Sequence, residues 1–330
     1  MRMFKLSAMT AVMAAAFAAT PALADDVVKM DGSSTVYPIS EAVAEEFQKA
    51  EKGKIRVTVG VSGTGGGFKK FCRGETDFSG ASRQIKDSER ADCAKNGIKF
   101  IEVPVAFDAL TVVVHPSNTW ASTMTPAQLK KAWEPSAQGK IMNWKDIDPS
   151  FPDQALKLYG PGADSGTFDY FTEEINGKSK AIRGDFTASE DDNVLVQGVS
   201  RDRGGMGYFG LAYYEENKDK LKAVAIVNKA GKPVLPSLET VNNLTYNPLA
   251  RPLFMYVAVE SLKKPNVKKF MDFTMKNVSK LSKEVGYVDL PANFMKAATK
   301  RYNDGLTGTV FTPENADVPM DKLLTMKGKD

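Results

Sequence analysis

The sequence predicts an α/β protein built from two lobes, and three observations support this prediction. Short apolar strands alternate with helical segments, a βαβ rhythm that produces a mostly parallel sheet with ligands beyond the carboxyl ends of its strands. The chain of 330 residues exceeds what one hydrophobic core usually organises. The pattern also changes near Val113 and near Leu253, which indicates two crossings between lobes and a hinge that closes around a ligand.

The first residues predict a secretory signal. Arg2 and Lys5 precede an apolar stretch over residues 8–19, and Ala-Leu-Ala at 22–24 is a cleavage site of the Ala-x-Ala type. We therefore expect residues 1–24 to be a signal peptide and the protein to be exported. No later segment approaches the roughly 20 apolar residues that a membrane-spanning helix needs.

The expected first lobe comprises residues 25–113 and 254–330. In its first helix, Ile39, Val43 and Phe47 recur at the spacing of one buried helical face. The expected elements are strands at 27–30, 55–59, 77–82, 101–106 and 110–116, helices at 37–51 and 67–73, then a strand at 254–259 and helices at 266–277 and 279–285.

The expected second lobe comprises residues 114–253. It opens with a region of helix and loop, in which Pro126 follows Thr125 at the start of a helix. A strand at 156–159 then leads through a turn into a helix at 167–175. This is the same order of strand, turn and helix as in the first lobe.

Three segments rich in Ser, Thr and Gly separate a strand from a helix: Asp-Gly-Ser-Ser-Thr at 31–35, Ser-Gly-Thr-Gly-Gly-Gly at 62–67 and Asp-Ser-Gly-Thr at 164–167. Small hydroxylated residues can cap a helix and leave its first N–H groups free, and a helix N-terminus is an anion site through its dipole and unpaired donors. One such turn is common, whereas three predict convergence on a shared oxyanion.

Charge and cysteine content narrow the class of protein. With 44 basic and 40 acidic residues, the chain lacks the basic excess of a nucleic-acid-binding protein. Cys72 and Cys93 are the two cysteines, and in an oxidising compartment we expect them to form one structural disulfide. A thiol nucleophile or a metal site is the weaker alternative, because the chain has one His and no Cys-x-x-Cys.

Six segments carry a resemblance to a known family: 31–38, 61–70, 81–83, 164–171, 188–197 and 205–210. Taken together they resemble the periplasmic phosphate-binding proteins of PstS type, in particular the SphX-like branch, and the resemblance extends over residues 28–288. It implies a class II periplasmic-binding-protein fold, a periplasmic location, capture of inorganic phosphate between the lobes, and delivery to the inner-membrane permease of an ABC importer. We expect a monomer with no cofactor, metal or catalytic residue.

The resemblance also implies which residues hold the ligand. Many members have an Asp at the position of Arg83 and an Arg before the third turn, where this chain has Gly-Pro-Gly at 160–162. The cation has thus moved to the other lobe, and we expect Arg83 to be the one full positive charge at the site, with Asp164 as the candidate acceptor of the ligand's proton. The complete expected set is Ser34, Thr35, Ser62, Thr64, Ser82, Arg83, Asp164, Ser165, Gly166 and Thr167.

Other functions stay open at this stage. If Asp164 only caps its helix, discrimination weakens, and sulfate or another oxyanion becomes a plausible ligand. An exported phosphoester hydrolase would use Ser34 or Ser165 as nucleophile, but it needs a base or a metal, and the sequence places neither beside these serines. A surface adhesion or scavenging role without a transporter is the third alternative.

Overall fold

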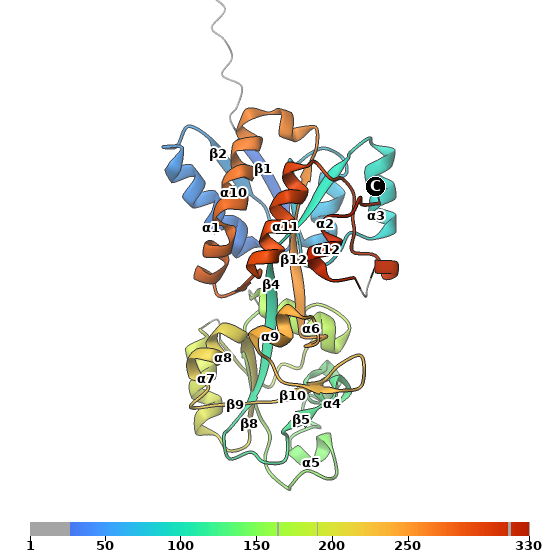
Figure 1. Cartoon of the computed structure of the whole chain (residues 1–330). Helices are drawn as coiled ribbons and strands as arrows, with labels where there is room; N and C mark the ends of the chain where they lie inside the picture. The colour runs from blue at the N-terminus through green and yellow to red at the C-terminus, as the bar shows by residue number, and fades with distance from the viewer. Residues whose placement is uncertain (1–26, 164, 190, 316–317, 330) are drawn as a thin grey trace, which may run out of the picture.

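The computed structural model describes residues 27–163, 165–189, 191–315 and 318–329. These residues form two lobes, one above the other in Figure 1, joined by strands β4 (Phe100–Val114) and β12 (Ala250–Ala258). The predicted signal peptide and Asp164 lie outside the described residues. Among the helices of the described chain, none has the length and apolar character to cross a membrane.

Lobe I, the upper lobe of Figure 1, is a sheet covered by helices on its two faces. Strand β1 pairs in parallel with β2 on one side and with β3 on the other. Helix α1 buries Ile39, Val43 and Phe47, the face that the sequence predicts. The elements are β1 (Val27–Gly32), α1 (Tyr37–Ala50), β2 (Arg56–Val59), α2 (Gly63–Phe71), β3 (Phe78–Ala81), α3 (Asp87–Lys95), η2 (Ser261–Lys263), α10 (Pro265–Glu284), β13 (Val288–Asp289), α11 (Ala292–Asn303), η3 (Pro313–Asn315) and α12 (Met320–Leu323).

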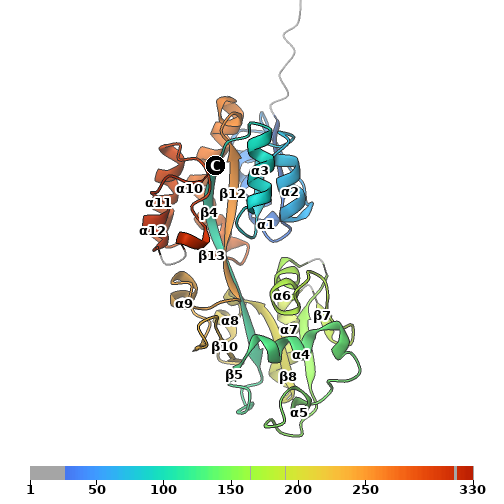
Figure 2. The ribbon, with the colours of Figure 1, turned by 90° about the vertical axis from the view of Figure 1, so that its right-hand side faces the viewer.

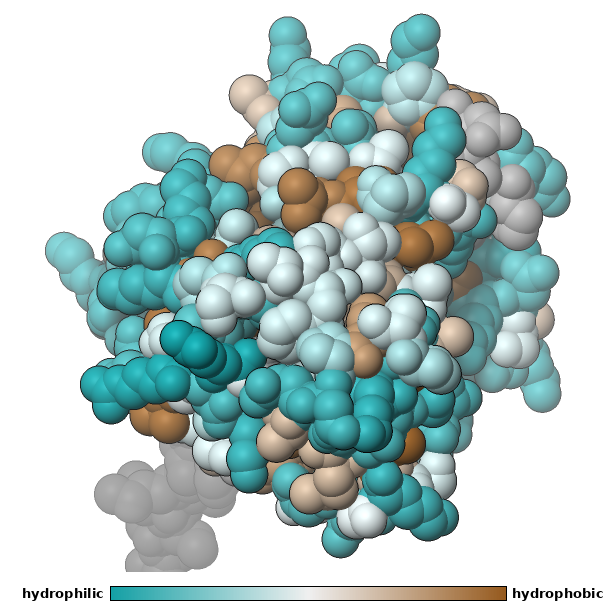
Figure 3. Space-filling view, turned by 90° about the horizontal axis from the view of Figure 1, so that it is seen from below, coloured by the Kyte–Doolittle hydropathy of each residue, from teal (hydrophilic) through white to brown (hydrophobic). Residues whose placement is uncertain are grey.

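Lobe II repeats the parallel arrangement, with β6 paired to β7 and to β8. Trp133 packs edge-on against Phe171 and Tyr208 in its core. Seen from below in Figure 3, hydrophilic side chains cover most of the periphery of the molecule, and apolar residues appear as small separate areas. The elements are β5 (Thr123–Met124), α4 (Pro126–Trp133), η1 (Pro135–Ala137), α5 (Trp144–Ile147), β6 (Lys157–Pro161), α6 (Gly166–Asn176), β7 (Thr187–Ser189), α7 (Asp192–Arg201), β8 (Gly205–Gly210), α8 (Leu211–Asn217), β9 (Lys222–Ala223), β10 (Ala225–Val227), β11 (Pro233–Val234) and α9 (Leu238–Asn242).

The two connecting strands differ from the sequence-based expectation. Residues 101–116 were expected to form two strands, but β4 is a single buried strand of 15 residues. It pairs antiparallel with β12 as far as Ala109, and with β8 from Leu110 onward (Figure 2). The prediction of a mostly parallel sheet is therefore right within each lobe and wrong for the strands between them.

Two further boundaries bear on the domain prediction. The helices expected at 266–277 and 279–285 are one helix, α10, because Val278 is part of its buried face. The predicted lobe boundaries, at 113/114 and 253/254, both fall inside the connecting strands. The register of the β4–β12 pair shifts between Leu253 and Phe254, as at a β-bulge. The exact boundaries stay a prediction.

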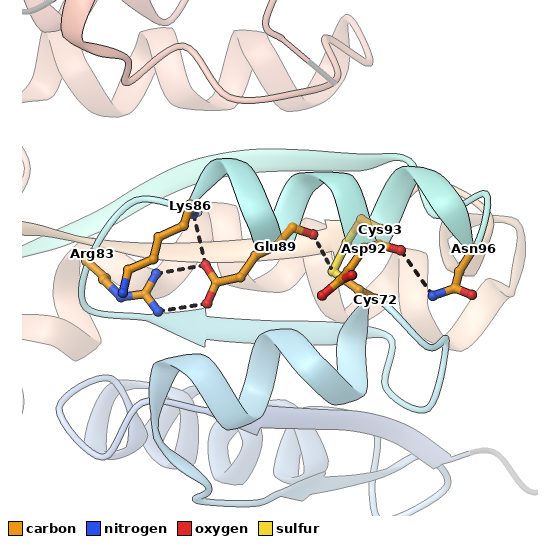
Figure 4. Close-up of a disulfide and its surroundings, with 7 residues drawn as sticks. All are labelled: Cys72, Arg83, Lys86, Glu89, Asp92, Cys93 and Asn96. Atoms are coloured by element: carbon orange, nitrogen blue, oxygen red, sulfur yellow. Dashed lines mark hydrogen bonds and ion pairs between the residues drawn. A yellow bond between two sulfur atoms is a disulfide. The ribbon is translucent and has the colours of Figure 1, made fainter.

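Cys72 and Cys93 form the predicted disulfide (Figure 4). Cys72 follows the last residue of α2, and Cys93 lies in α3, so the bond joins the ends of two helices that pack on the same part of lobe I. Both cysteines are buried. The disulfide therefore fixes α3 against α2.

Removing the disulfide should destabilise the protein. Its cysteines are 21 residues apart, and cross-linking a loop of this size restricts the unfolded chain by about 3 kcal/mol. We expect Cys72→Ala/Cys93→Ala to lose about this much free energy of unfolding in denaturant titrations. Dithiothreitol should destabilise the wild type and leave the double variant unchanged. Equal stability of the oxidised wild type and the variant would contradict this expectation.

Glu102 is a fully buried carboxyl group in β4. It accepts hydrogen bonds from the hydroxyl groups of Tyr256 and Thr309 and from the N–H of Val310. Burial raises the pKa of Glu102 to about 7, although these hydrogen bonds and the charge of Arg301 lower it. The network fastens the C-terminal part of lobe I to a connecting strand.

This shift predicts that the protein loses stability as the pH rises. The unfolded carboxyl titrates at about 4.3, so between that pH and about 7 the native state binds the proton more tightly than the unfolded state. The free energy of unfolding should fall by up to about 3 kcal/mol between about pH 4 and about pH 8 through this group. Glu102→Gln should flatten the profile measured by urea unfolding, whereas Glu45→Gln, at an exposed site, should not. Parallel profiles for all three proteins would contradict the assignment.

Candidate functional site

The first Ser/Thr turn, residues 33–35, lies where β1 ends and α1 begins. The backbone of Gly32 has a φ of +149°, and a Cβ on it would lie 2.1 Å from the carbonyl oxygen of Gly80. Only glycine fits this close approach of β1 to β3. The hydroxyl of Ser33 accepts the N–H of Thr35 at 3.1 Å, which tightens the turn.

The second turn is the first turn of α2 itself. The sequence predicted a loop at 62–66 and a helix from Gly67, but α2 begins at Gly63. A Cβ on Gly67 would lie 2.5 Å from Cα of Gly32, so the glycines let this helix pack directly on the end of β1. The N–H groups of the first helical turn have no partner within the helix, and here they lie at the edge of the interlobe cleft.

Ser62 is held on the inner side of this turn. Its hydroxyl donates to the carboxylate of Asp31, which also accepts a hydrogen bond from the ammonium of Lys70 at 2.6 Å. Asp31 is buried. Ser62 therefore anchors the start of α2 to the end of β1.

The third turn leads into α6 of lobe II and touches the first turn of lobe I. The hydroxyl of Thr35 lies 3.5 Å from the carbonyl oxygen of Gly166, and the hydroxyl of Ser34 donates to Asp169 at 2.9 Å. A Cβ on Gly166 would lie 2.8 Å from Cα of Thr35. The hydroxyl of Tyr287 donates to the carbonyl oxygen of Thr35 at 2.7 Å and supports the same turn from lobe I.

Two cavities lie beside this contact, and Ser34 lines both. The arginine cavity has a volume of about 240 Å³, and the tyrosine cavity about 380 Å³. A larger groove of about 680 Å³ between α10 and α11 is lined by no residue of the three turns. The arginine cavity is lined by Ser33, Ser34, Thr35, Gly63, Thr64, Gly65, Ser82, Arg83, Lys86, Asp169, Glu173, Ser179 and Arg251. The tyrosine cavity is lined by Ser34, Tyr37, Pro38, Val61, Asp108, Ala109, Ser165, Gly166, Thr167, Asp192, Gly210, Tyr213, Val285, Gly286 and Tyr287.

The predicted ligand residues are thus brought to one region but not into one cavity. Those of lobe I other than Ser62 line the arginine cavity, and the described ones of the third turn line the tyrosine cavity. Ser62 lines neither of the two, and Asp164 lies outside the described residues. The assignment of the ten residues to a ligand stays a prediction. The residues in the arginine cavity are Ser34, Thr35, Thr64, Ser82 and Arg83, and those in the tyrosine cavity are Ser34, Ser165, Gly166 and Thr167.

Arg83 reaches the cavity from the end of β3 and is paired on its far side (Figure 4). Its two terminal nitrogens each donate to a different oxygen of Glu89 at 2.8 Å, and one also donates to the carbonyl oxygen of Gln84. Glu89 raises the pKa of Arg83 above its ordinary value. Since Glu89 lies in α3, the helix that the disulfide fixes, the guanidinium is held by a rigid support and its charge is partly neutralised.

Arg251 is a second arginine at the cavity, and the sequence analysis did not identify it. It lies in β12, opposite Asp108 of β4 in the strand register. Its guanidinium lies 3.5 Å from the centre of the Tyr170 ring, and its Nη2 donates to the hydroxyl of Thr35 at 3.3 Å. The available signal was a lone arginine at the start of a buried apolar strand, since residues 249–254 read Leu-Ala-Arg-Pro-Leu-Phe.

Carboxylates accompany these cations. Asp108 is buried beside Arg251, and burial raises its pKa to about 6 even though the charge of Arg251 lowers it. Asp169 and Glu173 project from α6 into the arginine cavity, where Glu173 lies 3.8 Å from Arg251. The cavity therefore holds positive groups from lobe I and from β12 next to negative groups from lobe II. Among the described residues, no group of three or more His, Cys, Asp or Glu side chains is placed to hold a metal ion.

Comparison with known proteins agrees with the resemblance seen in the sequence. A family model described as a PBP superfamily domain matches residues 18–278. Protein SphX of Synechococcus elongatus is 60% identical over 285 residues, which cover 86% of this chain and 84% of that protein. The phosphate-binding protein PstS of Staphylococcus saprophyticus is 42% identical over 267 residues, which cover 80% of each chain.

Solved structures give the same answer for the fold. The structure of a possible phosphate binding protein from Planctomyces limnophilus matches with a TM-score of 0.82 at 46% identity, and the match covers 85% of this chain and 98% of that one. An ABC-type phosphate transport receptor from Vibrio cholerae, at 22% identity and a TM-score of 0.63, shares the fold. The predicted α/β fold of a periplasmic binding protein is thereby confirmed. The chain belongs to the PBP superfamily and, within it, to the family that includes the SphX and PstS proteins.

Proposed function

We propose that this chain is an exported solute-binding protein that captures inorganic phosphate between its lobes and delivers it to the inner-membrane permease of an ABC importer. One observation carries the proposal: turns from the two lobes meet at Thr35 and Gly166, beside a cavity that holds Arg83 and Arg251. The relatives named as phosphate-binding proteins support the choice of ligand.

The chemistry of the arginine cavity suits a small oxyanion. Hydroxyl groups of Ser34, Thr35, Thr64 and Ser82 and the first N–H groups of α2 are compact donors, and they surround a space of about 240 Å³. Each hydrogen bond to a charged group contributes about 1.5–3 kcal/mol. Part of that gain is offset by removing a dianion from water and by ordering the closed cleft.

The donors of the third turn would bind the same anion. Ser165, Gly166 and Thr167 face the neighbouring tyrosine cavity. We propose that bending of β4 and β12, the two strands between the lobes, brings this turn round the anion held by lobe I. Export through the signal peptide at 1–24, a periplasmic location and a monomeric state are further parts of the proposal.

The first experiment separates binding from catalysis and phosphate from sulfate. Titration calorimetry should show one phosphate bound per chain, and a chromogenic phosphate ester should not be turned over. Phosphate at about 100 times its Kd should add about 2.7 kcal/mol to the free energy of unfolding and raise the melting temperature, because the ligand binds the native state alone. Sulfate at the same concentration is the control. Equal stabilisation by sulfate would favour a general oxyanion-binding protein, and release of the chromophore would favour the hydrolase.

Arg83→Ala should weaken phosphate binding by about 1.5–3 kcal/mol, because a charge-assisted donor is lost. The substitution also leaves Glu89 without its cation at the edge of the cavity. Arg73→Ala is a matched control, since Arg73 also pairs with a glutamate, Glu75, but is more than half exposed. A phosphate affinity within threefold of the wild type by calorimetry would remove Arg83 from the binding site.

A further inference from the structure

We propose that Arg251 is a second anion-binding residue of this site, supplied by a strand that connects the two lobes. The inference rests on the proposed capture of phosphate in the cleft. It assigns to the ligand a cation that lies outside the three Ser/Thr/Gly turns. It also places one point of contact with the anion on the hinge.

The guanidinium of Arg251 is held in position by an aromatic ring and by a carboxylate. Its side chain is 12% exposed and lies over the Tyr170 ring, whose centre is 3.5 Å from the guanidinium carbon. Nε lies 3.6 Å from the carboxylate of Asp108, the residue opposite it on β4. Tyr170 is itself fixed, because its hydroxyl donates to the carbonyl oxygen of Pro248 at 2.5 Å. Stacking and charge therefore set the plane of the guanidinium before a ligand arrives.

Most of its hydrogen-bond donors are not used by the described residues. An arginine has five N–H donors and no acceptor. Nη2 donates to the hydroxyl of Thr35, whereas Nε, although buried, makes no hydrogen bond to any residue that the structure describes. The oxygen of Glu173 is 3.8 Å from Nη1, too far for a hydrogen bond. A buried, charged group with free donors at the wall of a polar cavity is the environment that an oxyanion completes.

Arg83 differs in this respect. Its terminal nitrogens are already bonded to both oxygens of Glu89. The ion-pair contacts of Arg251 with described residues are both long, at 3.6 Å to Asp108 and 3.8 Å to Glu173. An anion in the arginine cavity would therefore gain more binding free energy from Arg251 than from Arg83, because the donors of Arg251 need not leave another strong acceptor.

Arg251 lies on a strand between the lobes, so an anion bound to it would affect how the lobes move. Arg251 contacts Thr35 of lobe I and Tyr170 of lobe II from a strand that runs between them. An anion bound to its guanidinium would thus be attached to both lobes and to β12. Occupancy of the cleft would then restrict bending of the connecting strands.

Calorimetric titration with inorganic phosphate tests the inference. Arg251→Gln should weaken binding at least about 10-fold, the value expected for one lost charge-assisted bond. Arg251→Lys should lose part of the affinity, because an ammonium cannot present the planar pair of donors. The double variant Asp108→Asn/Arg251→Gln removes the buried counterion together with the cation, so no unpaired charge is left to destabilise the fold. This variant should also bind phosphate at least about 10-fold more weakly than the wild type. Arg56→Gln makes the same charge change at an exposed site of lobe I and should bind like the wild type.

A second measurement uses the unaltered protein. The Nε–H resonance of Arg251, identified by its loss in Arg251→Lys, should shift on titration with phosphate and not with sodium chloride. Affinity within threefold of the wild type in the double variant, or a resonance that phosphate leaves unchanged, would overturn the role of Arg251. Absence of phosphate binding by the wild type would instead overturn the proposed function, so the two failures are distinguishable.

Discussion

The contact between Thr35 and Gly166 is the constraint on which the rest of the cleft depends. The backbones of the two lobes approach so closely there that a single methyl group on Gly166 would lie 2.8 Å from Cα of Thr35. The same pair of turns is reinforced by Ser34 with Asp169, and by Tyr287 from behind. Because α6 begins at this contact, the contact brings the first N–H groups of α6, which have no partner within the helix, next to the first turn of lobe I. The arginine cavity and the tyrosine cavity both lie beside the contact between Thr35 and Gly166.

Carboxylates neutralise part of the positive charge in the cleft before any ligand binds. Arg83 is paired with Glu89 and Arg251 lies between Asp108 and Glu173, so neither cation is an isolated charge while the cleft holds only water. Such pairing lowers the cost of keeping guanidinium groups at a partly buried surface. It also means that a bound anion competes with carboxylates. The arginine that is held less tightly by its carboxylate partners then contributes more to binding the anion. The distances single out Arg251 as that residue.

Local features of the site could be predicted from the sequence, because they depend on neighbours along the chain. The three turns, the face of α1 and the disulfide were all predicted in this way. The Gly run was misread as a loop, since only its packing on Gly32 explains why so many glycines begin a helix. The sequence predicted no strand at Asp108, which falls in the gap between the strands expected at 101–106 and 110–116. Strand β4 continues through Asp108, because Arg251, on a strand far away in sequence, provides the counterion of this carboxylate.

The division of the ligand residues between two cavities was also beyond prediction. It depends on how the lobes stand relative to one another, and no periodicity or motif encodes that angle. Arg251 was missed for a related reason, because its value as a donor comes from the register of β12 on β4 rather than from any residue beside it in the sequence. Sequence patterns thus located the helix starts, and tertiary pairing decided which of them face each other.

Both ends of the described chain lie in lobe I, where β1 begins at Val27 and the segment after α12 pairs with Thr309 (Figure 1). Lobe II is therefore an insertion that the chain enters through β4 and leaves through β12. A tether or label attached at either terminus would load only the lobe that carries it. The inserted lobe would remain free to swing, so immobilising the protein by its ends should leave capture of its cargo intact.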